Sequence, residues 1–153
     1  MHALVKRAKT DYRFILMISR FMQGVPSKNY LQEAETIFNI YHKMIWQFGW
    51  IRYQKDPHQV ELVSAIWLIF ERRAADCDEF ACLAAASAGA VGMPYRFVTM
   101  SNSIADPDTP RHVYTQVEIP NHGWLSMDLT EKTAYPGWEA PATRRWHYPE
   151  PRY

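Results

Sequence analysis

Hydrophobic and polar positions follow two different periods along the chain. In the first half, apolar residues recur every three or four positions, which is the spacing of a helix with one buried face. This pattern predicts three helices, over residues 3–23, about 29–48 and 60–73. Gly24 and Pro26 end the first of them, because glycine suits the position after a helix and proline discourages its continuation. The stretch 50–57 between the second and third helices is expected to be extended and to end in a turn at Asp56–Pro57.

The second half begins with a fourth predicted helix over 76–91 and continues with alternating strands. Small side chains dominate this helix, so it can approach a sheet closely, and we expect it to be central and buried. Period-two alternation then predicts strands over 95–100, 111–119 and 124–130. The last two are joined by a short turn and form a hairpin. Helices followed by antiparallel strands are typical of the α+β class.

The chain is expected to form one domain over 1–133, with a helical N-terminal part (1–73), followed by a tail over 134–153. The tail is rich in proline and aromatic residues, which predicts an irregular arm that wraps the domain. Its aromatic residues could instead form a surface that binds a partner.

Composition and charge narrow the class of protein. The 153 residues are 48% hydrophobic, and the formal net charge is only +1, which argues against nucleic acid or an anionic membrane as a partner. The longest apolar runs, at 14–18 and 65–70, are far too short to span a bilayer. The two cysteines lack zinc-site spacing and fit a reducing compartment. We therefore expect a cytoplasmic protein without metal or cofactor.

Cys77 is the first candidate for chemistry. It falls in the first turn of the predicted helix over 76–91, where unpaired N–H groups and the helix dipole stabilise a thiolate and can form half of an oxyanion hole. Asp76 is the expected N-cap, and Asp78 and Glu79 suit the same dipole without having to point at the sulfur. Cys77 is therefore either a nucleophile or a small buried side chain. Cys82, in the middle of the helix, is expected to be structural.

A nucleophilic cysteine needs a base and a group that orients that base. Among six histidines, His112 differs from the others because it opens a strand directly after the polar loop 101–110. Alternation places Asp128 on a like-facing position of the next strand. A carboxylate there could hold the imidazole in one tautomer.

Two blocks of the chain resemble the transglutaminase-like superfamily of papain-fold thiol enzymes, namely DCDEFACLAAASAGAVGMPYRFV and HVYTQVEIPNHGWLSMDLT. The resemblance covers roughly Ile51–Thr130. The architecture of the chain is similar to that of small bacterial or phage-encoded members of the superfamily. The resemblance implies that Cys77 is the nucleophile, His112 the general base and acid, and Asp128 the residue that orients the histidine. It also implies a polar side chain upstream of the cysteine as second oxyanion donor, and the spacing leaves four candidates open: Trp46, Gln47, Trp50 and Gln54.

The chain departs from the usual family pattern at three places. Ala75 stands where the family has glycine, Val113–Tyr114 replaces the common Ala-Trp, and Leu129 replaces a frequent proline. The first change affects the shape of the loop, and the second the substrate groove.

The resemblance implies acyl transfer from a peptide or glutamine carboxamide through a thioester. Release by water would make the protein a protease or amidase, and release by an amine a transglutaminase; the sequence leaves this choice open, as it does the oligomeric state. The expected partner is a protein or peptide substrate. One alternative is a non-catalytic structural or interaction protein that retains the fold, for example a phage component. Another is a cation site formed by the acids at 76, 78 and 79 with Asp106 and Asp108.

Overall fold

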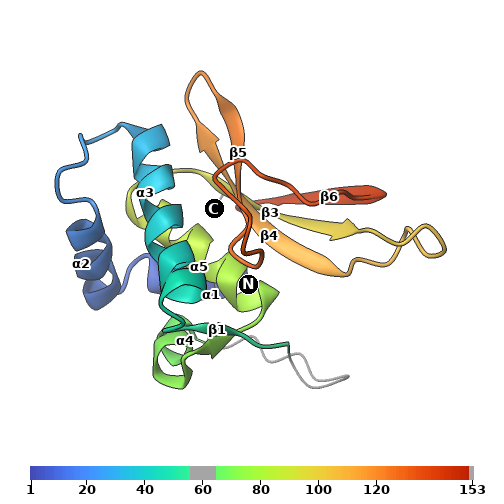
Figure 1. The fold of residues 1–153 in the computed structure, drawn as a ribbon. Coiled ribbons are helices and arrows are strands. Elements are labelled where there is room, and N and C mark those ends of the chain that lie inside the picture. Colours follow the sequence, from blue (N-terminus) through green and yellow to red (C-terminus); the bar gives the residue numbers. More distant parts are fainter. Residues whose placement is uncertain (56–64, 152–153) are drawn as a thin grey trace.

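The computed structural model describes residues 1–55 and 65–151. A group of helices packs on one face of an antiparallel sheet (Figure 1), which confirms the α+β class. The α-helices are α1 (His2–Ala8), α2 (Tyr12–Phe21), α3 (Tyr30–His42), α4 (Ile66–Arg72) and α5 (Cys77–Ala90). The sheet has the strand order β5-β4-β3-β6, with β3 at Tyr95–Ser101, β4 at His112–Ile119, β5 at Gly123–Met127 and β6 at Arg144–Pro149. A short parallel pair joins β1 (Arg52–Tyr53) to β2 (Ala74–Ala75).

The single helix predicted over 3–23 is two helices, α1 and α2. Asp11 separates them, because its backbone is extended and its side chain accepts the N–H of Arg13 as the N-cap of α2. The same carboxylate accepts the indole N–H of Trp67 at 3.2 Å. A short polar side chain that bonds its own backbone competes with helix in this way, and the apolar periodicity on either side hides the break.

The second predicted helix changes its geometry near its end. Asn29 caps α3 by accepting the N–H of Gln32, and the last turns, Lys43–Gln47, form a π-helix (η1). The third helix is α4, which ends at Arg72 and is followed by Arg73 in the left-handed conformation (φ 54°). Its predicted start at 60–64 and the turn at Asp56–Pro57 lie outside the described residues.

Helix α5 is the centre of the fold, as its small side chains predict. Every residue from Glu79 to Ala88 is buried, and the helix contacts α1–α4 on its sides and β3 and β4 of the sheet. Polar groups on its surface are paired: the hydroxyls of Tyr41 and Ser87 lie 2.8 Å apart, and Thr115 donates to the carbonyl of Ala81 at 2.7 Å. The close fit fixes the start of α5 relative to the start of β4.

Strands β3, β4 and β5 agree with the predicted strands except at the end of β5. β3 pairs with β4, and β4 pairs with β5 through a hairpin in which Ile119 is opposite Gly123. β5 ends at Met127, so Asp128 and the two residues after it leave the sheet. None of the helices in residues 1–55 and 65–151 has the length and hydropathy to cross a membrane.

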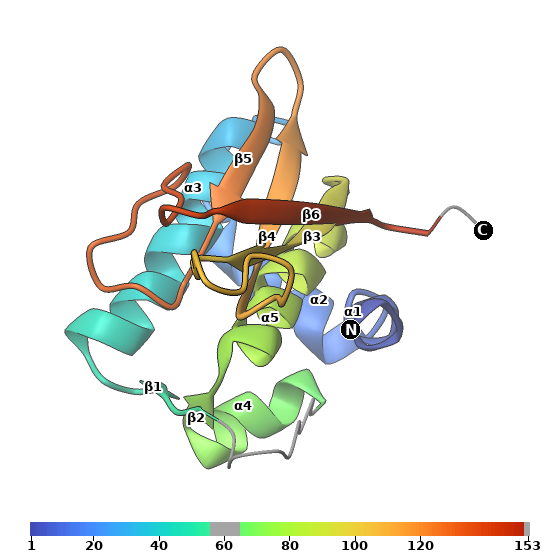
Figure 2. The same cartoon turned by 90° about the vertical axis from the view of Figure 1, so that its right-hand side faces the viewer.

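The tail contains a strand, which corrects the prediction that it is irregular. Residues 144–149 form β6 and pair antiparallel with β3 along the edge of the sheet opposite β5 (Figure 2). Proline is tolerated here because Pro149 is the last residue of an edge strand. β3 would otherwise present unpaired backbone groups along its edge. The pairing of β6 with β3, a strand far away in the sequence, therefore outweighs the local effect of the prolines, which favours irregular structure.

Candidate active site

The start of α5 is built around a capping box. The Asp76 side chain accepts the N–H groups of Asp78 at 3.1 Å and Glu79 at 3.2 Å, and the Glu79 carboxylate accepts the N–H of Asp76 at 3.3 Å. Glu79 also pairs with Arg72. The prediction that Asp76 caps the helix is confirmed. This cap fixes Cys77 as the first residue of α5, with only Asp76 between it and the end of β2.

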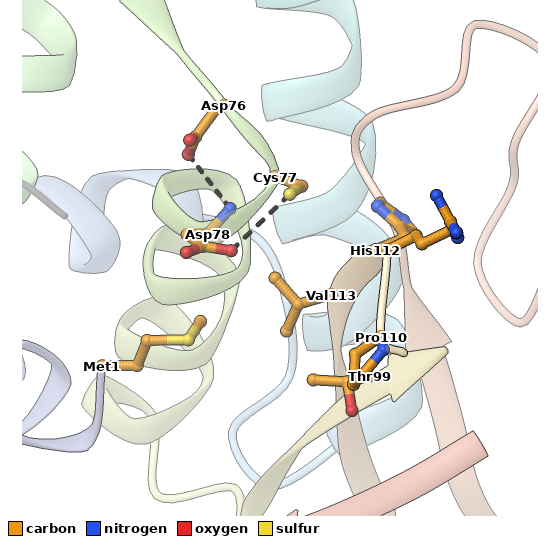
Figure 3. Close-up of a pocket in the computed structure, with 9 residues that line it drawn as sticks. Met1, Asp76, Cys77, Asp78, Thr99, Pro110, His112 and Val113 are labelled. Carbon is orange, nitrogen blue, oxygen red and sulfur yellow. Dashed lines mark hydrogen bonds between the residues drawn. The ribbon is translucent and has the colours of Figure 1, made fainter. Parts of the chain in front are cut away.

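Cys77 and His112 line the same cleft, which has a volume of about 330 Å³ (Figure 3). The sulfur comes from the start of α5 and the imidazole from the first residue of β4. The backbone N–H of Val113, the next residue of β4, donates to the sulfur of Cys77. Other residues that line the cleft include Asp76, Asp78, Thr99, Pro110 and Arg111. The structure therefore brings together two residues that lie 35 positions apart in the sequence.

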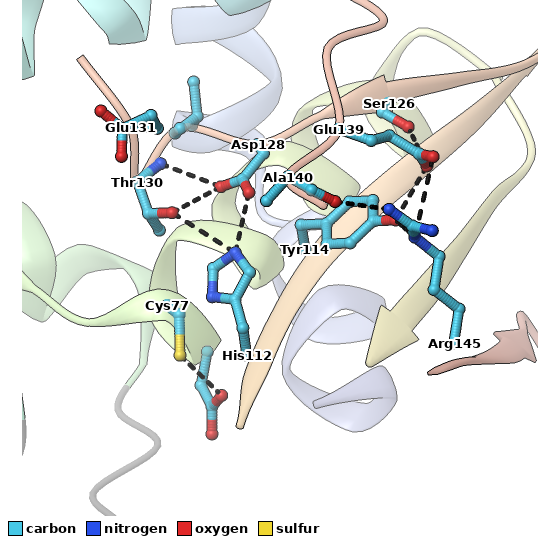
Figure 4. Close-up of polar contacts among 12 residues, drawn as sticks. Cys77, His112, Tyr114, Ser126, Asp128, Thr130, Glu131, Glu139, Ala140 and Arg145 are labelled. Atoms are coloured by element: carbon cyan, nitrogen blue, oxygen red, sulfur yellow. Dashed lines mark hydrogen bonds and ion pairs between the residues drawn. The ribbon is translucent and has the colours of Figure 1, made fainter. Parts of the chain in front are cut away.

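Asp128 holds the other side of the imidazole. Its Oδ2 lies 2.7 Å from His112 Nε2, and its side chain is only 3% exposed. Because a carboxylate accepts, we assign the proton to Nε2, which leaves Nδ1 as the basic nitrogen. Figure 4 shows the imidazole between Asp128 and the Cys77 side chain. Of the three predicted residues, Cys77 and His112 thus line one cleft, and Asp128 holds His112 from behind.

Thr130 fixes Asp128 in turn. Its backbone N–H and its hydroxyl donate to Asp128 Oδ1 at 3.0 and 2.6 Å. Burial alone would raise the pKa of Asp128, but the hydrogen bonds from His112 and Thr130 outweigh it and hold the pKa below its usual value. Asp128 is therefore ionised at neutral pH and able to stabilise a protonated His112.

The thiol of Cys77 is protonated in this arrangement. Burial first, and then the charge of Asp78, raise the pKa of Cys77 to about 12, although the Val113 N–H acts in the opposite direction. The S–H donates to Asp78 Oδ1 at 3.6 Å. The stabilised thiolate expected from the helix dipole is thus not the resting state, because the carboxylate of Asp78 turns back onto the sulfur.

The four candidates for a second oxyanion donor lie in different environments. Trp46 donates its indole N–H to the carbonyl of Leu129 at 3.0 Å, and Trp50 is 57% exposed and stacks on Phe48. Gln47 and Gln54 are exposed. Gln54 follows β1 directly, and its backbone N–H donates to Ala75 at 2.9 Å, two residues before Cys77. The backbone of Gln54 therefore lies beside the segment that leads into Cys77.

Tyr53 is a site residue that sequence reasoning missed. Its ring stacks on Phe80 with centroids 6.4 Å apart. Burial first, and then the ionisable groups of Cys77, Asp76 and Asp128, raise the pKa of Tyr53 to about 12. Its phenol therefore belongs to the electrostatic surroundings of the cleft. The only signal in the sequence was its position beside Gln54.

The acids considered for cation binding are engaged separately. Asp76 and Glu79 form the capping box, Asp106 pairs with Arg111 at 3.2 Å, and Asp108 pairs with Arg144. Among residues 1–55 and 65–151, no group of three or more histidine, cysteine or acidic side chains could hold a metal ion. Cys82 is free and fully buried in the core.

The family of the chain follows from a comparison with known families. The sequence model of the transglutaminase-like superfamily matches residues 20–129. The chain belongs to the transglutaminase-like superfamily. The match begins upstream of the predicted limit of resemblance at Ile51 and includes α3, and it ends just before the tail. The comparison with curated proteins gave no match.

Two solved structures share the fold. One, from Parabacteroides distasonis ATCC 8503, is described as a “putative protease” and superposes with a TM-score of 0.59 at 12% identity over 83% of this chain. The other, from Cytophaga hutchinsonii, is described as a “putative cysteine protease” and has a TM-score of 0.51 at 15% identity over 88% of this chain. The chain spans 25% and 49% of their lengths. These likenesses establish the papain-like, transglutaminase-like fold, and the family supports a thiol enzyme.

Proposed function

We propose that the protein is a thiol-dependent acyl-transfer enzyme that acts on peptide or glutamine carboxamides. Cys77 is the nucleophile, His112 the general base and acid, and Asp128 the residue that orients His112. The observation that carries this proposal is that Cys77 and His112 line one cleft while a buried Asp128 holds His112 at 2.7 Å. The substrate is then a protein or peptide segment that lies in this cleft.

The first half of the reaction starts from a neutral thiol. As the sulfur attacks the carboxamide carbon, its proton passes to His112 Nδ1 and the carbonyl electrons move to oxygen. The backbone N–H of Cys77, at the start of α5, can donate to this oxyanion. When the C–N bond breaks, His112 returns the proton to the leaving nitrogen. The products are a thioester on Cys77 and a free amine or ammonia.

The second half depends on what attacks the thioester. Water gives a carboxylic acid, and a primary amine gives a new amide; in either case His112 takes the proton from the attacking group and returns it to the sulfur. Aromatic walls that exclude water would favour an amine. Tyr114 is buried behind His112, where its hydroxyl donates to Glu139, and Trp124 lies under Arg96; neither is among the residues that line the cleft. This observation supports hydrolysis as the main reaction.

Casein incubated with and without a fluorescent primary amine separates these reactions. We expect peptide fragments from the wild-type protein and from Cys82→Ala, and none from Cys77→Ala. Cys82→Ala is the matched control because it removes the other thiol and leaves the cleft intact. Incorporated amine without fragments would instead identify transamidation.

A non-catalytic protein would behave differently. If Cys77→Ala and the wild-type protein gave the same products, or if neither acted on casein and iodoacetamide failed to modify Cys77 faster than Cys82, the proposal would be wrong. The structural or interaction role would then be favoured.

A further inference from the structure

A polar cluster lies on the face of the sheet that is turned away from α5, two residues along β4 from His112. Its centre is the carboxylate of Glu139, which comes from the segment between β5 and β6 (Figure 4). Glu139 Oε1 accepts three hydrogen bonds, from the Tyr114 hydroxyl at 2.8 Å, the Gln116 amide at 2.6 Å and the Ser126 hydroxyl at 2.7 Å. One side chain of the tail therefore joins two strands of the sheet.

Arg145 completes this group, which we call the Glu139 cluster (Tyr114, Gln116, Ser126, Glu139 and Arg145). Its Nε donates to the Tyr114 hydroxyl at 3.2 Å and lies 3.7 Å from Glu139 Oε2, and its guanidinium also donates to the carbonyl of Ala140. The Tyr114 hydroxyl thus donates to one charged group and accepts from another. Bonds to charged groups are the stronger ones, so the phenol has little freedom to move.

Tyr114 connects this cluster to the proposed catalytic histidine. Its side chain is 2% exposed, and its ring stacks on the imidazole of His112 with centroids 6.0 Å apart and planes inclined by 23°. Asp128 holds His112 at Nε2, which fixes one atom of the ring. A hydrogen bond at one nitrogen still permits the ring to tilt, and a ring stacked against its face opposes that tilt.

We propose that the Glu139 cluster positions His112 through Tyr114, so that Nδ1 stays directed at the sulfur of Cys77. Glu139 and Arg145 are positioning residues, because they act on the histidine through the tyrosine. Both lie beyond residue 129, where the match to the family ends, so the tail supplies two members of the cluster and β4 and β5 supply the other three. The inference rests on the proposed function, because it assumes that His112 is the base.

Two variants and one control test this role. Glu139→Gln removes the charge at the centre of the cluster, and Tyr114→Phe keeps the ring on His112 but removes the hydroxyl that fixes it. Glu118→Gln is the matched control, since Glu118 is an exposed acid on β4 outside the cluster. All proteins are compared at a temperature where urea titration shows them to be folded.

We expect both cluster variants to lower kcat about five- to twentyfold with KM within about twofold, because small displacements of a base reduce the rate more than substrate binding. The double variant should be no slower than the slower single variant, since both changes interrupt the same connection. NMR of the His112 imidazole should show altered nitrogen shifts and a displaced titration midpoint in both variants. The Glu118→Gln control should match the wild-type protein in every measurement.

The outcomes separate this inference from the proposed function. If the wild-type protein shows neither turnover nor selective alkylation of Cys77, the proposed function fails and the positioning role fails with it. If the wild-type protein is active while Glu139→Gln and Tyr114→Phe both match Glu118→Gln in kcat and in the His112 titration, the positioning role alone is overturned. A loss of kcat with an unchanged His112 titration also overturns it.

Discussion

The side chain of Asp78 has two opposing effects on Cys77. As an acid in the first turn of α5, it stabilises the start of the helix through the dipole. As the acceptor of the Cys77 S–H at 3.6 Å, it disfavours the thiolate. In the proposed reaction the thiol therefore depends on His112 to remove its proton, which couples reactivity to the geometry of the histidine. In the proposed reaction, the rate therefore depends on the position of the imidazole relative to the Cys77 sulfur.

Asp78→Asn should make Cys77 more reactive. Removing a negative charge beside the sulfur lowers the thiol pKa from about 12, and below the pKa each unit of decrease raises the thiolate fraction about tenfold. We expect faster iodoacetamide modification of Cys77 in the variant between pH 7 and 10, with mass-spectrometric assignment. Glu71→Gln, an exposed acid on α4, is the control.

The wild-type protein should show a modification rate that keeps rising with pH across this range. A plateau near pH 7 in the wild-type protein, or an unchanged rate in Asp78→Asn, would contradict the neutral resting thiol.

Among the helices, α5 is the one whose cap bears on the proposed function, because its first turn holds the proposed nucleophile, Cys77. The Asp76 side chain accepts two of the N–H groups that have no partner within the helix, and β2 ends at the residue before Asp76. A cap of this type both stabilises the helix and fixes the direction in which the Cys77 side chain leaves it.

Asp76→Ala should lower the free energy of unfolding by about 1 kcal/mol, the usual effect of losing such a cap. Urea unfolding with an unchanged m-value measures this. Asp76→Asn keeps an acceptor at the same position and should retain most of the stability. Equal losses in the two variants would show that the negative charge, and not the hydrogen bonds, supports the start of the helix.

For the molecule as a whole, the central fact is that α5 lies between the other helices and the sheet. Alanines at 84, 85, 86 and 88 are fully buried, so neighbouring elements approach its backbone closely. Interiors packed to this density have no room for a larger side chain.

Ala84→Leu should therefore destabilise the protein by about 1–3 kcal/mol, through the strain of an overfilled core. Ala3→Leu, the same change at an exposed position of α1, is the control and should have little effect. Thermal or urea unfolding compares the two. Similar small effects in both would mean that the interface around α5 can expand.

Much of the architecture could be predicted because it depends on short-range signals. Apolar periodicity located the helices and the β4–β5 hairpin, and the Asp76 cap followed from residue types at a helix start. The break at Asp11 was missed because the apolar period continues across it. Cys77, His112 and Asp128 were selected by their order and by resemblance to a family; Cys77 and His112 prove to line one cleft, and Asp128 pairs with His112.

The amino-acid order alone was enough to specify the class of fold, the start of the central helix and the identity of the three candidate residues, since each depends on side chains a few positions apart or on a contiguous motif. Three features required the assembled chain: the pairing of β6 with β3, the turn of Asp78 onto the Cys77 sulfur, and the Glu139 cluster behind His112. Each arises from a contact whose partner is chosen by folding. Strand pairing and buried hydrogen bonds join residues far apart in the chain, and a side chain's rotamer depends on the space that the other elements leave to it.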